Sequence, residues 1–290
     1  MNLGSMTRAA WLNTLLAGVV AALGLFVFLK PGTGVPPDYP LSTLKAEEAR
    51  SMRIERPGAV PIVLEKRENG WFMTAPLAAR ADSLRVQRLL ALAAARSADR
   101  LAATDLARFE LERPAARLTI AGQNFDFGVV SPVSREQYIL TGGAVYTVGL
   151  QYGAALPGNP AALIDKQLLS AGEVPVRFEF KDYNVVRDDS GKWTLRPPHG
   201  EVSQDDYQRW VDAWRHASAL RVELYAMGKP LLEIKVEFRN GAKVALGLLA
   251  SGAEVALLRP DEKLVYYFLS EPGQRLLSPP TAREDRAEKK

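Results

Sequence analysis

The chain has 290 residues, of which 47% are hydrophobic and 24% are charged, values that are ordinary for a globular protein of one or two domains. It contains no cysteine, which excludes disulfides, thiolate metal sites, a cysteine nucleophile and a lipid-modified cysteine. The formal net charge is only +4 and the basic residues are scattered, so nothing indicates a surface for nucleic acid.

Residues 11–29 carry no charge and are bracketed by Arg8 and Lys30. As a helix, this run would span roughly the hydrocarbon core of a bilayer. A cleaved signal peptide is the alternative, but the run is longer than the usual apolar region of such peptides, and no small-residue cleavage site follows it. The sequence therefore predicts a transmembrane anchor within residues 1–30, with the body of the protein outside the cytoplasm.

The segments on either side of the body are expected to form a spacer and a tail. Residues 31–50 open with a stretch rich in proline and glycine, which cannot continue a helix and favours an extended spacer. Residues 281–290 are mostly charged and offer almost no apolar side chain to a core, so we expect a disordered tail.

The body of the chain repeats one local pattern. Trp71 directly follows a glycine and is soon followed by a proline. Trp193 has the same neighbours, except that one residue separates it from its glycine. An amphipathic stretch ending in Ser-Ala follows each tryptophan at the same interval to within one residue. A fixed period with the same pattern indicates two copies of one folding unit. We therefore expect tandem repeats at residues 51–170 and 171–280.

The first repeat is expected to open with strands at 52–55 and 60–66 and a returning strand at 71–74, joined by an Asn-Gly turn that suits a tight hairpin. Asp82 or Ser83 can cap the helix that follows. Its apolar stripe has the spacing of one helix face and consists of Val86, Leu89, Leu90, Ala93 and Ser97.

The remainder of the first repeat is expected to form a sheet. A short helical turn is predicted at 104–109, and short strands between 118 and 148 are joined by tight turns, which favours an antiparallel meander. Residues 161–169 are predicted to form a short helix that bridges the two repeats.

The second repeat is expected to copy this plan. Strands within 176–187 lead into a turn at 188–191, and Ser203 with Asp206 resembles a capping box. A meander is predicted over 234–269. The helical stripe consists of Tyr207, Trp210, Val211, Trp214 and Ser218. We therefore predict an α+β fold with an N-terminal transmembrane helix followed by two tandem repeats, each a mainly antiparallel sheet with one long helix packed on a face.

Few side chains suggest chemistry. The two histidines, His199 and His216, lie in a predicted turn and on the second predicted helix, where structural or solvent-facing roles are favoured over a metal site. The acidic pairs 188–189 and 205–206 lie in a turn and at a helix start, where aspartate commonly bonds the backbone. No phosphate-binding loop or nucleophile elbow occurs. The sequence predicts no catalytic residue, no cofactor-binding residue, no metal ligand and no enzyme activity.

The aromatic residues allow two interpretations. Tyr207, Trp210 and Trp214 could form a stacking platform for sugars or peptides, but their spacing matches the core stripe of the first repeat, which favours burial. Tyr152 and Tyr183 are the aromatic residues that we expect to be exposed and available to a ligand.

Four short motifs resemble the bacterial domain of unknown function 4340 family, at residues 71–76, 81–82, 109–114 and 127–128. The resemblance covers about residues 52–278. It departs from the family at Glu110, where the family usually has glycine. It implies a single N-terminal membrane helix and, for some members, genes next to gliding-motility-type ABC transporter components. It implies no known enzyme activity.

These observations lead to two hypotheses about function. The first is a non-enzymatic accessory or scaffold protein of the cell envelope, held in the bacterial inner membrane through residues 11–29 with a periplasmic body, serving an ABC-type transporter or another envelope protein. The alternative is an extracytoplasmic ligand-binding module, for glycan or peptide, that uses the cleft between the repeats. A hydrolase would need an acid, a base and a nucleophile that the sequence does not show.

Overall fold

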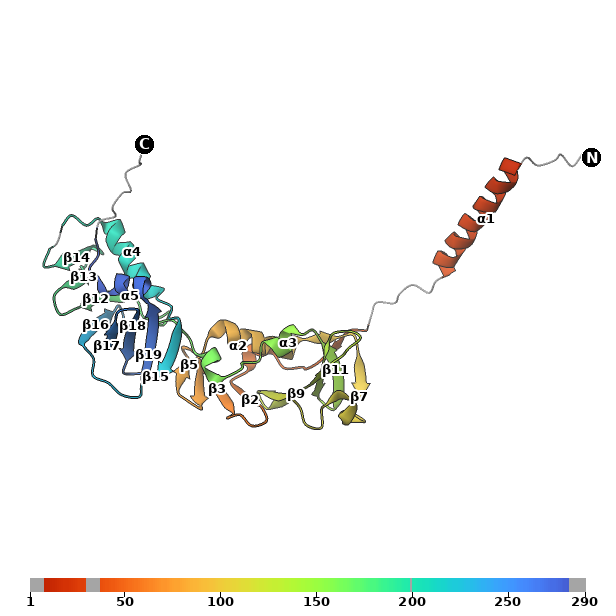
Figure 1. The fold of residues 1–290 in the computed structure, drawn as a ribbon, viewed down its shortest axis with the longest axis horizontal. Coiled ribbons are helices and arrows are strands. Elements are labelled where there is room, and N and C mark those ends of the chain that lie inside the picture. Colours follow the sequence, from red (N-terminus) through yellow and green to blue (C-terminus); the bar gives the residue numbers. More distant parts are fainter. Residues whose placement is uncertain (1–7, 30–36, 199, 282–290) are drawn as a thin grey trace, which may run out of the picture.

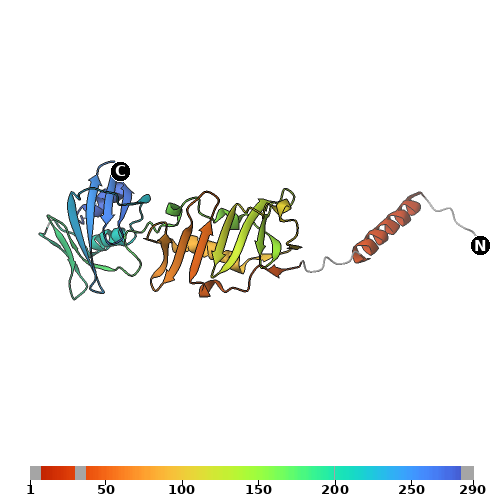
Figure 2. The same ribbon diagram turned by 90° about the horizontal axis from the view of Figure 1, so that it is seen from below.

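The computed structural model of the protein describes residues 8–29, 37–198 and 200–281. Most of the predicted tail, part of the predicted spacer and His199 lie outside these residues. The described chain forms two antiparallel sheets with few helices, so the predicted α+β class is confirmed. The two sheets lie end to end, as both views show (Figures 1 and 2).

The N-terminal apolar run forms helix α1 (Arg8–Leu29), and its described side chains, from Trp11 to Phe26, are exposed. Among the described residues, no helix is long and apolar enough to cross a membrane. The transmembrane anchor therefore stays a prediction.

The first sheet has nine strands in the order β5-β4-β3-β2-β8-β9-β10-β11-β7. Alternate side chains of β2 and β3 face the core, and across these two strands Met52 pairs with Leu64 and Ile54 with Ile62. The bounds in sheet order are β5 (Ala79–Arg80), β4 (Gly70–Ala75), β3 (Ile62–Arg67), β2 (Ser51–Glu55), β8 (Ala116–Ile120), β9 (Gln123–Val130), β10 (Gln137–Thr141), β11 (Ala144–Val148) and β7 (Arg100–Ala102).

The second sheet has eight strands in the order β14-β13-β12-β16-β17-β18-β19-β15. Its order reproduces that of the first sheet once β5 is set aside, with β14 in the place of β4 and β15 in the place of β7. The bounds in sheet order are β14 (Trp193–Arg196), β13 (Asn184–Arg187), β12 (Pro175–Glu179), β16 (Leu232–Phe238), β17 (Lys243–Ser251), β18 (Glu254–Arg259), β19 (Leu264–Leu269) and β15 (Arg221–Leu224). The shared order is what a duplicated folding unit produces.

Helix α2 (Ser83–Leu90) is shorter than the long helix that we predicted. Asp82 caps it by accepting hydrogen bonds from two backbone N–H groups, and the chain then tightens into the 3-10 turn η2 (Ala91–Ala94). Ser97, which we placed on the helical stripe, instead lies in strand β6 (Arg96–Ser97), which pairs with β1 (Tyr39–Pro40).

Helix α4 (Gln204–Arg215) begins with the predicted capping box between Ser203 and Asp206. The helix ends before Ser218, and Ser218 is exposed. The prediction that Ser218 belongs to the buried helical stripe is therefore wrong. After each helix the chain reaches an edge strand, β7 or β15, which pairs with the last strand of the meander, β11 or β19.

The predicted bridging helix at 161–169 is also wrong. Only the 3-10 turn η4 (Pro160–Leu163) forms, and the chain then runs extended, with isolated bridges from Ile164 to Ala81 and from Gln167 to Ser218. The other short helical turn that we predicted forms as η3 (Leu106–Phe109). Two helices were not predicted, α3 (Gln151–Ala154) and α5 (Ser270–Leu277).

The helices cover one face of each sheet: α2 and α3 lie on the first, and α4 and α5 lie on the second (Figure 1). Trp71 and Trp193 both point into this layer and are 8% and 5% exposed. Most of the buried apolar side chains of the two repeats belong to one continuous cluster, which also includes Leu168 and Leu169 from the segment between the sheets. The repeats therefore share a core.

Gly128 lies where the connector after β7 crosses the outer face of the first sheet. A Cβ at this position would lie 2.2 Å from the carbonyl oxygen of Phe109, so a side chain forces the connector away from the sheet. We expect Gly128→Ala to lower the free energy of unfolding by about 2 kcal/mol. Gly158→Ala is the matched control, because nothing lies within 4 Å of its added Cβ. Urea unfolding measures the free energy of unfolding of both variants. Equal values would contradict the close contact between Gly128 and the Phe109 carbonyl.

Glu110 follows η3 in the same connector and has a φ of 55°, in the left-handed region that disfavours residues with a Cβ. The glycine that the family resemblance implies at this position would remove that cost, since the Glu110 side chain is exposed. We expect Glu110→Gly to raise the midpoint of thermal unfolding slightly, by the equivalent of about 0.5–1 kcal/mol. A lowered midpoint would show that the glutamate makes a contribution that this geometry does not reveal.

Candidate functional site

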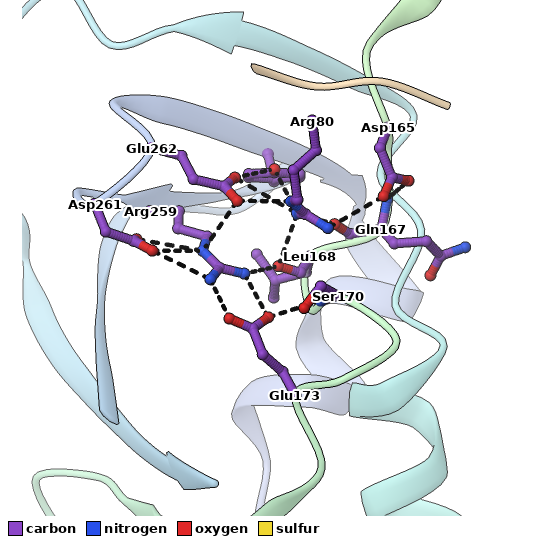
Figure 3. Close-up of polar contacts among 10 residues, drawn as sticks. Arg80, Asp165, Gln167, Leu168, Ser170, Glu173, Arg259, Asp261 and Glu262 are labelled. Atoms are coloured by element: carbon purple, nitrogen blue, oxygen red, sulfur yellow. Dashed lines mark hydrogen bonds and ion pairs between the residues drawn. The ribbon is translucent and has the colours of Figure 1, made fainter. Parts of the chain in front are cut away.

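The two repeats meet where three segments come together. The short edge strand β5 of the first repeat brings Arg80, and the extended linker, residues 164–174, brings Asp165 and Glu173. The end of β18 brings Arg259, and the turn after β18 brings Glu262. We call these five residues, with Tyr266 of β19, the junction cluster. Its members come from segments far apart in the chain (Figure 3).

Arg80 is the centre of one half of the junction cluster. Its Nε donates to Glu262 Oε1 at 2.6 Å, and its Nη1 lies 3.1 Å from Asp165 Oδ2. Its Nη2 donates to the carbonyl oxygen of Gln167 at 2.6 Å and to the hydroxyl of Tyr266 at 2.9 Å. The Tyr266 hydroxyl in turn donates to Glu262 Oε2 at 2.5 Å. One guanidinium therefore joins the first repeat, the linker and the second repeat.

Arg259 is the centre of the other half. Its Nη1 donates to the carbonyl oxygen of Leu168 at 2.7 Å and to Glu173 Oε2 at 2.9 Å, and its Nη2 bonds the other oxygen of the same carboxylate. Its Nε lies 3.5 Å from Glu262 Oε1, which connects the two halves. The Arg259 side chain is only 5% exposed, so this bidentate pair is largely shielded from water.

The charges of the junction cluster make its stability depend on pH. Burial by itself would raise the pKa of the Glu173 carboxyl, but the hydrogen bonds and the charge of Arg259 outweigh burial and hold that pKa below its ordinary value of 4.5. A carboxyl with a lowered pKa stabilises the fold above its ordinary pKa and loses that contribution as the pH falls through the lowered value. For Asp165, burial raises the pKa above its ordinary value of 3.8. Ionisation of this carboxyl therefore lowers the stability of the fold as the pH rises.

We therefore expect the free energy of unfolding to differ most between the parent chain and Glu173→Gln at pH values well above 4.5. Below that pH the difference should shrink, because the parent loses the ionised carboxylate that the variant never had. Urea unfolding at a series of pH values measures this. A difference that stays constant down to strongly acidic pH would contradict the assigned role of Glu173.

Beside the junction cluster lies a cavity of about 540 Å³, which we call the junction cavity. The first repeat contributes the β3–β4 hairpin with Trp71 and Phe72 and the start of α2 with Ser83; the second contributes Arg215 and His216 at the end of α4. The linker closes it with residues that include Asp165, Gln167, Leu169, Ser170, Ala171 and Glu173. Its volume is in the range of small-molecule sites, and such sites commonly lie between domains.

The structure places the residues that the sequence singled out in separate places. His216 caps the end of α4, where its Nδ1 donates to the backbone carbonyl of Asp212 at 2.9 Å, and this residue borders the junction cavity. Asp188 accepts from Ser190 and Lys192 within the β13–β14 turn, and those hydrogen bonds lower its pKa. Asp206 belongs to the capping box.

The aromatic residues do not form an exposed platform. Trp214 is fully buried, Trp210 donates from Nε1 to the carbonyl oxygen of Ser278 at 2.7 Å, and the hydroxyl of Tyr207 accepts from the backbone N–H of Leu195 on the edge strand β14. Tyr183, which we expected to be exposed, is half-buried, stacks on Phe180 and donates to the Leu277 carbonyl. Burial raises its pKa.

Tyr152 is likewise half-buried against the core, so our expectation of exposed tyrosines is wrong for both residues. The junction cluster was missed altogether. A weak signal existed at Arg80, a single charge among small apolar residues just before a helix cap. Among the described residues, no group of three or more histidine, aspartate or glutamate side chains is arranged to hold a metal ion.

A comparison with protein families matches residues 71–231 to the family described as "Domain of unknown function (DUF4340)". The match begins at the buried Trp71 and runs past α4 into the connector of the second repeat, and it includes Arg80 and Asp165. No curated protein and no solved structure matches the chain. Because the match spans more than half of the chain, this protein belongs to the DUF4340 family.

Proposed function

We propose that this protein is a membrane-anchored, non-enzymatic scaffold of the cell envelope. The observation that supports this best is the junction cluster, in which Arg80 and Arg259 bind the first repeat, the linker and the second repeat to one another. A shared core and nearly buried ion pairs hold the two sheets in one orientation. Such rigidity suits a scaffold that holds other proteins at fixed distances. This rigidity is tested directly by the distance measurement that closes the Discussion.

The membrane attachment is supported by α1. The run without charge at 11–29 matches the thickness of a bilayer, and the described apolar side chains of α1 are exposed, which is costly in water. We propose an inner-membrane anchor with a periplasmic body. Extraction of cell membranes with alkaline carbonate tests this: the full chain should stay in the pellet, and a chain lacking residues 1–36 should be released. Release of the full chain would overturn the anchor.

The partner that we propose is an ABC-type transporter or another integral envelope protein. The support is the family resemblance together with the rigid two-repeat body. Affinity purification of the full chain from membranes in mild detergent should recover transporter subunits. A matched chain that carries both Arg80→Met and Arg259→Met should recover fewer, if the fixed orientation of the repeats matters. Recovery of no membrane protein with the parent chain would overturn this proposal.

The junction cavity supports a second candidate function, binding of a small ligand between the repeats. Its volume, its position between two folding units and its aromatic and polar lining are those of ligand sites in other proteins. A ligand there would contact both repeats. An increase in the thermal unfolding midpoint on addition of a ligand tests this, and no increase with any compound of a broad library would overturn it.

A further inference from the structure

The polar groups that line the junction cavity divide into two kinds. The charged ones are already paired: Asp82 caps α2, Asp165 binds Arg80, and Glu173 binds Arg259. The Nη1 of Arg215 lies 3.6 Å from Oδ1 of Asp212 on its own helix, and the His216 ring is hydrogen-bonded to the Asp212 carbonyl. A charged ligand would have to compete with these internal pairs, several of which are largely buried, and breaking such a pair is costly.

The second kind is neutral. In the part of the chain that the structure describes, the side chains of Asn69, Ser83 and Gln167 and the hydroxyl of Ser170 make no hydrogen bond. In the close-up, the Gln167 side chain points away from Arg80 and the rest of the junction cluster (Figure 3). Two amides and two hydroxyls therefore offer both donors and acceptors to a ligand.

One aromatic side chain is available beside the cavity. Trp71 and Phe72 both border it, but as neighbours on β4 they point to opposite faces of the sheet, and Trp71 is 8% exposed and packs in the core, which leaves the half-buried Phe72. The ring of Phe72 also faces the guanidinium of Arg67, 4.7 Å from the ring centroid. Aromatic surface beside neutral donors and acceptors suits a ligand that has both an apolar face and many hydroxyls.

We propose that the junction cavity binds a neutral saccharide of a few rings, with its hydroxyls on Ser83, Gln167 and Ser170 and a ring face against Phe72. This assignment rests on the second function proposed above, ligand binding between the repeats. The hydroxyls of a sugar donate and accept, as do the amide and hydroxyl groups that are free in the cavity. The paired carboxylates and guanidiniums then keep their own partners.

The test is calorimetric titration of the full chain in detergent micelles with four probes: maltotriose, tri-N-acetylchitotriose, a galacturonate trimer and spermidine. We expect one or both neutral trimers to bind. Gln167→Ala and Ser83→Ala should each weaken that binding roughly fivefold. Gln208→Ala and Ser190→Ala are matched controls, since both residues are exposed and lie outside the cavity, and they should leave binding unchanged.

The other outcomes separate the two levels of the proposal. Binding of only the galacturonate trimer or spermidine, weakened by the cavity variants, would overturn the neutral class but retain a ligand site between the repeats. Binding of a neutral trimer that the cavity variants do not weaken would overturn the assigned location. Binding of none of the four probes would overturn the saccharide assignment, and the library screen described above would then decide whether the cavity binds any ligand.

Discussion

Arg259→Met should lower the free energy of unfolding by about 3–5 kcal/mol, the largest loss that we expect from removing one charge. The methionine keeps much of the buried volume but removes the partner of Glu173 and the donor to the Leu168 carbonyl. Glu173 is 18% exposed, so its charge remains in a mostly buried place without its cation. Urea unfolding of the full chain in detergent, followed by tryptophan fluorescence, measures the loss.

Two further variants test the cause. Arg53→Met removes an exposed pair with Glu55 and should change the free energy by less than about 0.5 kcal/mol. Adding Glu173→Met to Arg259→Met should restore part of the lost stability, because the unpaired charge disappears. The account of the junction cluster is contradicted if Arg259→Met costs no more than Arg53→Met.

Trp214→Ala should cost a similar amount, about 3–5 kcal/mol, for a different reason. Trp214 is fully buried, and its ring packs against Phe178 and Trp210 at centroid distances of 5.2 and 6.0 Å. Truncation leaves a cavity that these rings cannot fill without moving α4 from the second sheet. Thermal unfolding followed by circular dichroism measures the effect.

The matched control for this change is Met227→Ala, at a side chain that is 86% exposed, where we expect almost no effect. Trp214→Phe should lose much less than the alanine, because a ring remains and because the indole Nε1 of Trp214 has no hydrogen-bond partner among the described residues. A Trp214→Ala variant as stable as Met227→Ala would place the core of the second repeat elsewhere.

The parts of the fold that were predictable from the sequence are those with a period. Alternation along strands and helical spacing located the meanders, and the stripe from Val86 to Ala93 is buried as predicted. The capping residues Asp82 and Ser203 were predictable because they act on backbone groups a few residues away. These are local signals, and each needs only a short window of sequence.

The errors arose where distant segments decide the structure. Residues 164–169 run extended because they bridge to both repeats, and no local pattern shows that. Edge strand β15 forms because β19 offers an unpaired edge. The pair Arg80–Glu262 joins residues 182 positions apart, so a single sequence gives no spacing from which to infer it. The junction cavity was expected only as a general cleft between repeats, and its lining came from the structure.

The central claim is that the junction cluster holds the two repeats in one orientation. Because the chain has no native cysteine, spin labels can be attached at Glu112→Cys in the first repeat and Asp189→Cys in the second, both of which are exposed. Pulsed electron spin resonance should give a single narrow distance distribution, which broadens when Arg80→Met and Arg259→Met are added. A broad distribution in the parent chain, or one that these changes leave unaltered, would contradict the claim.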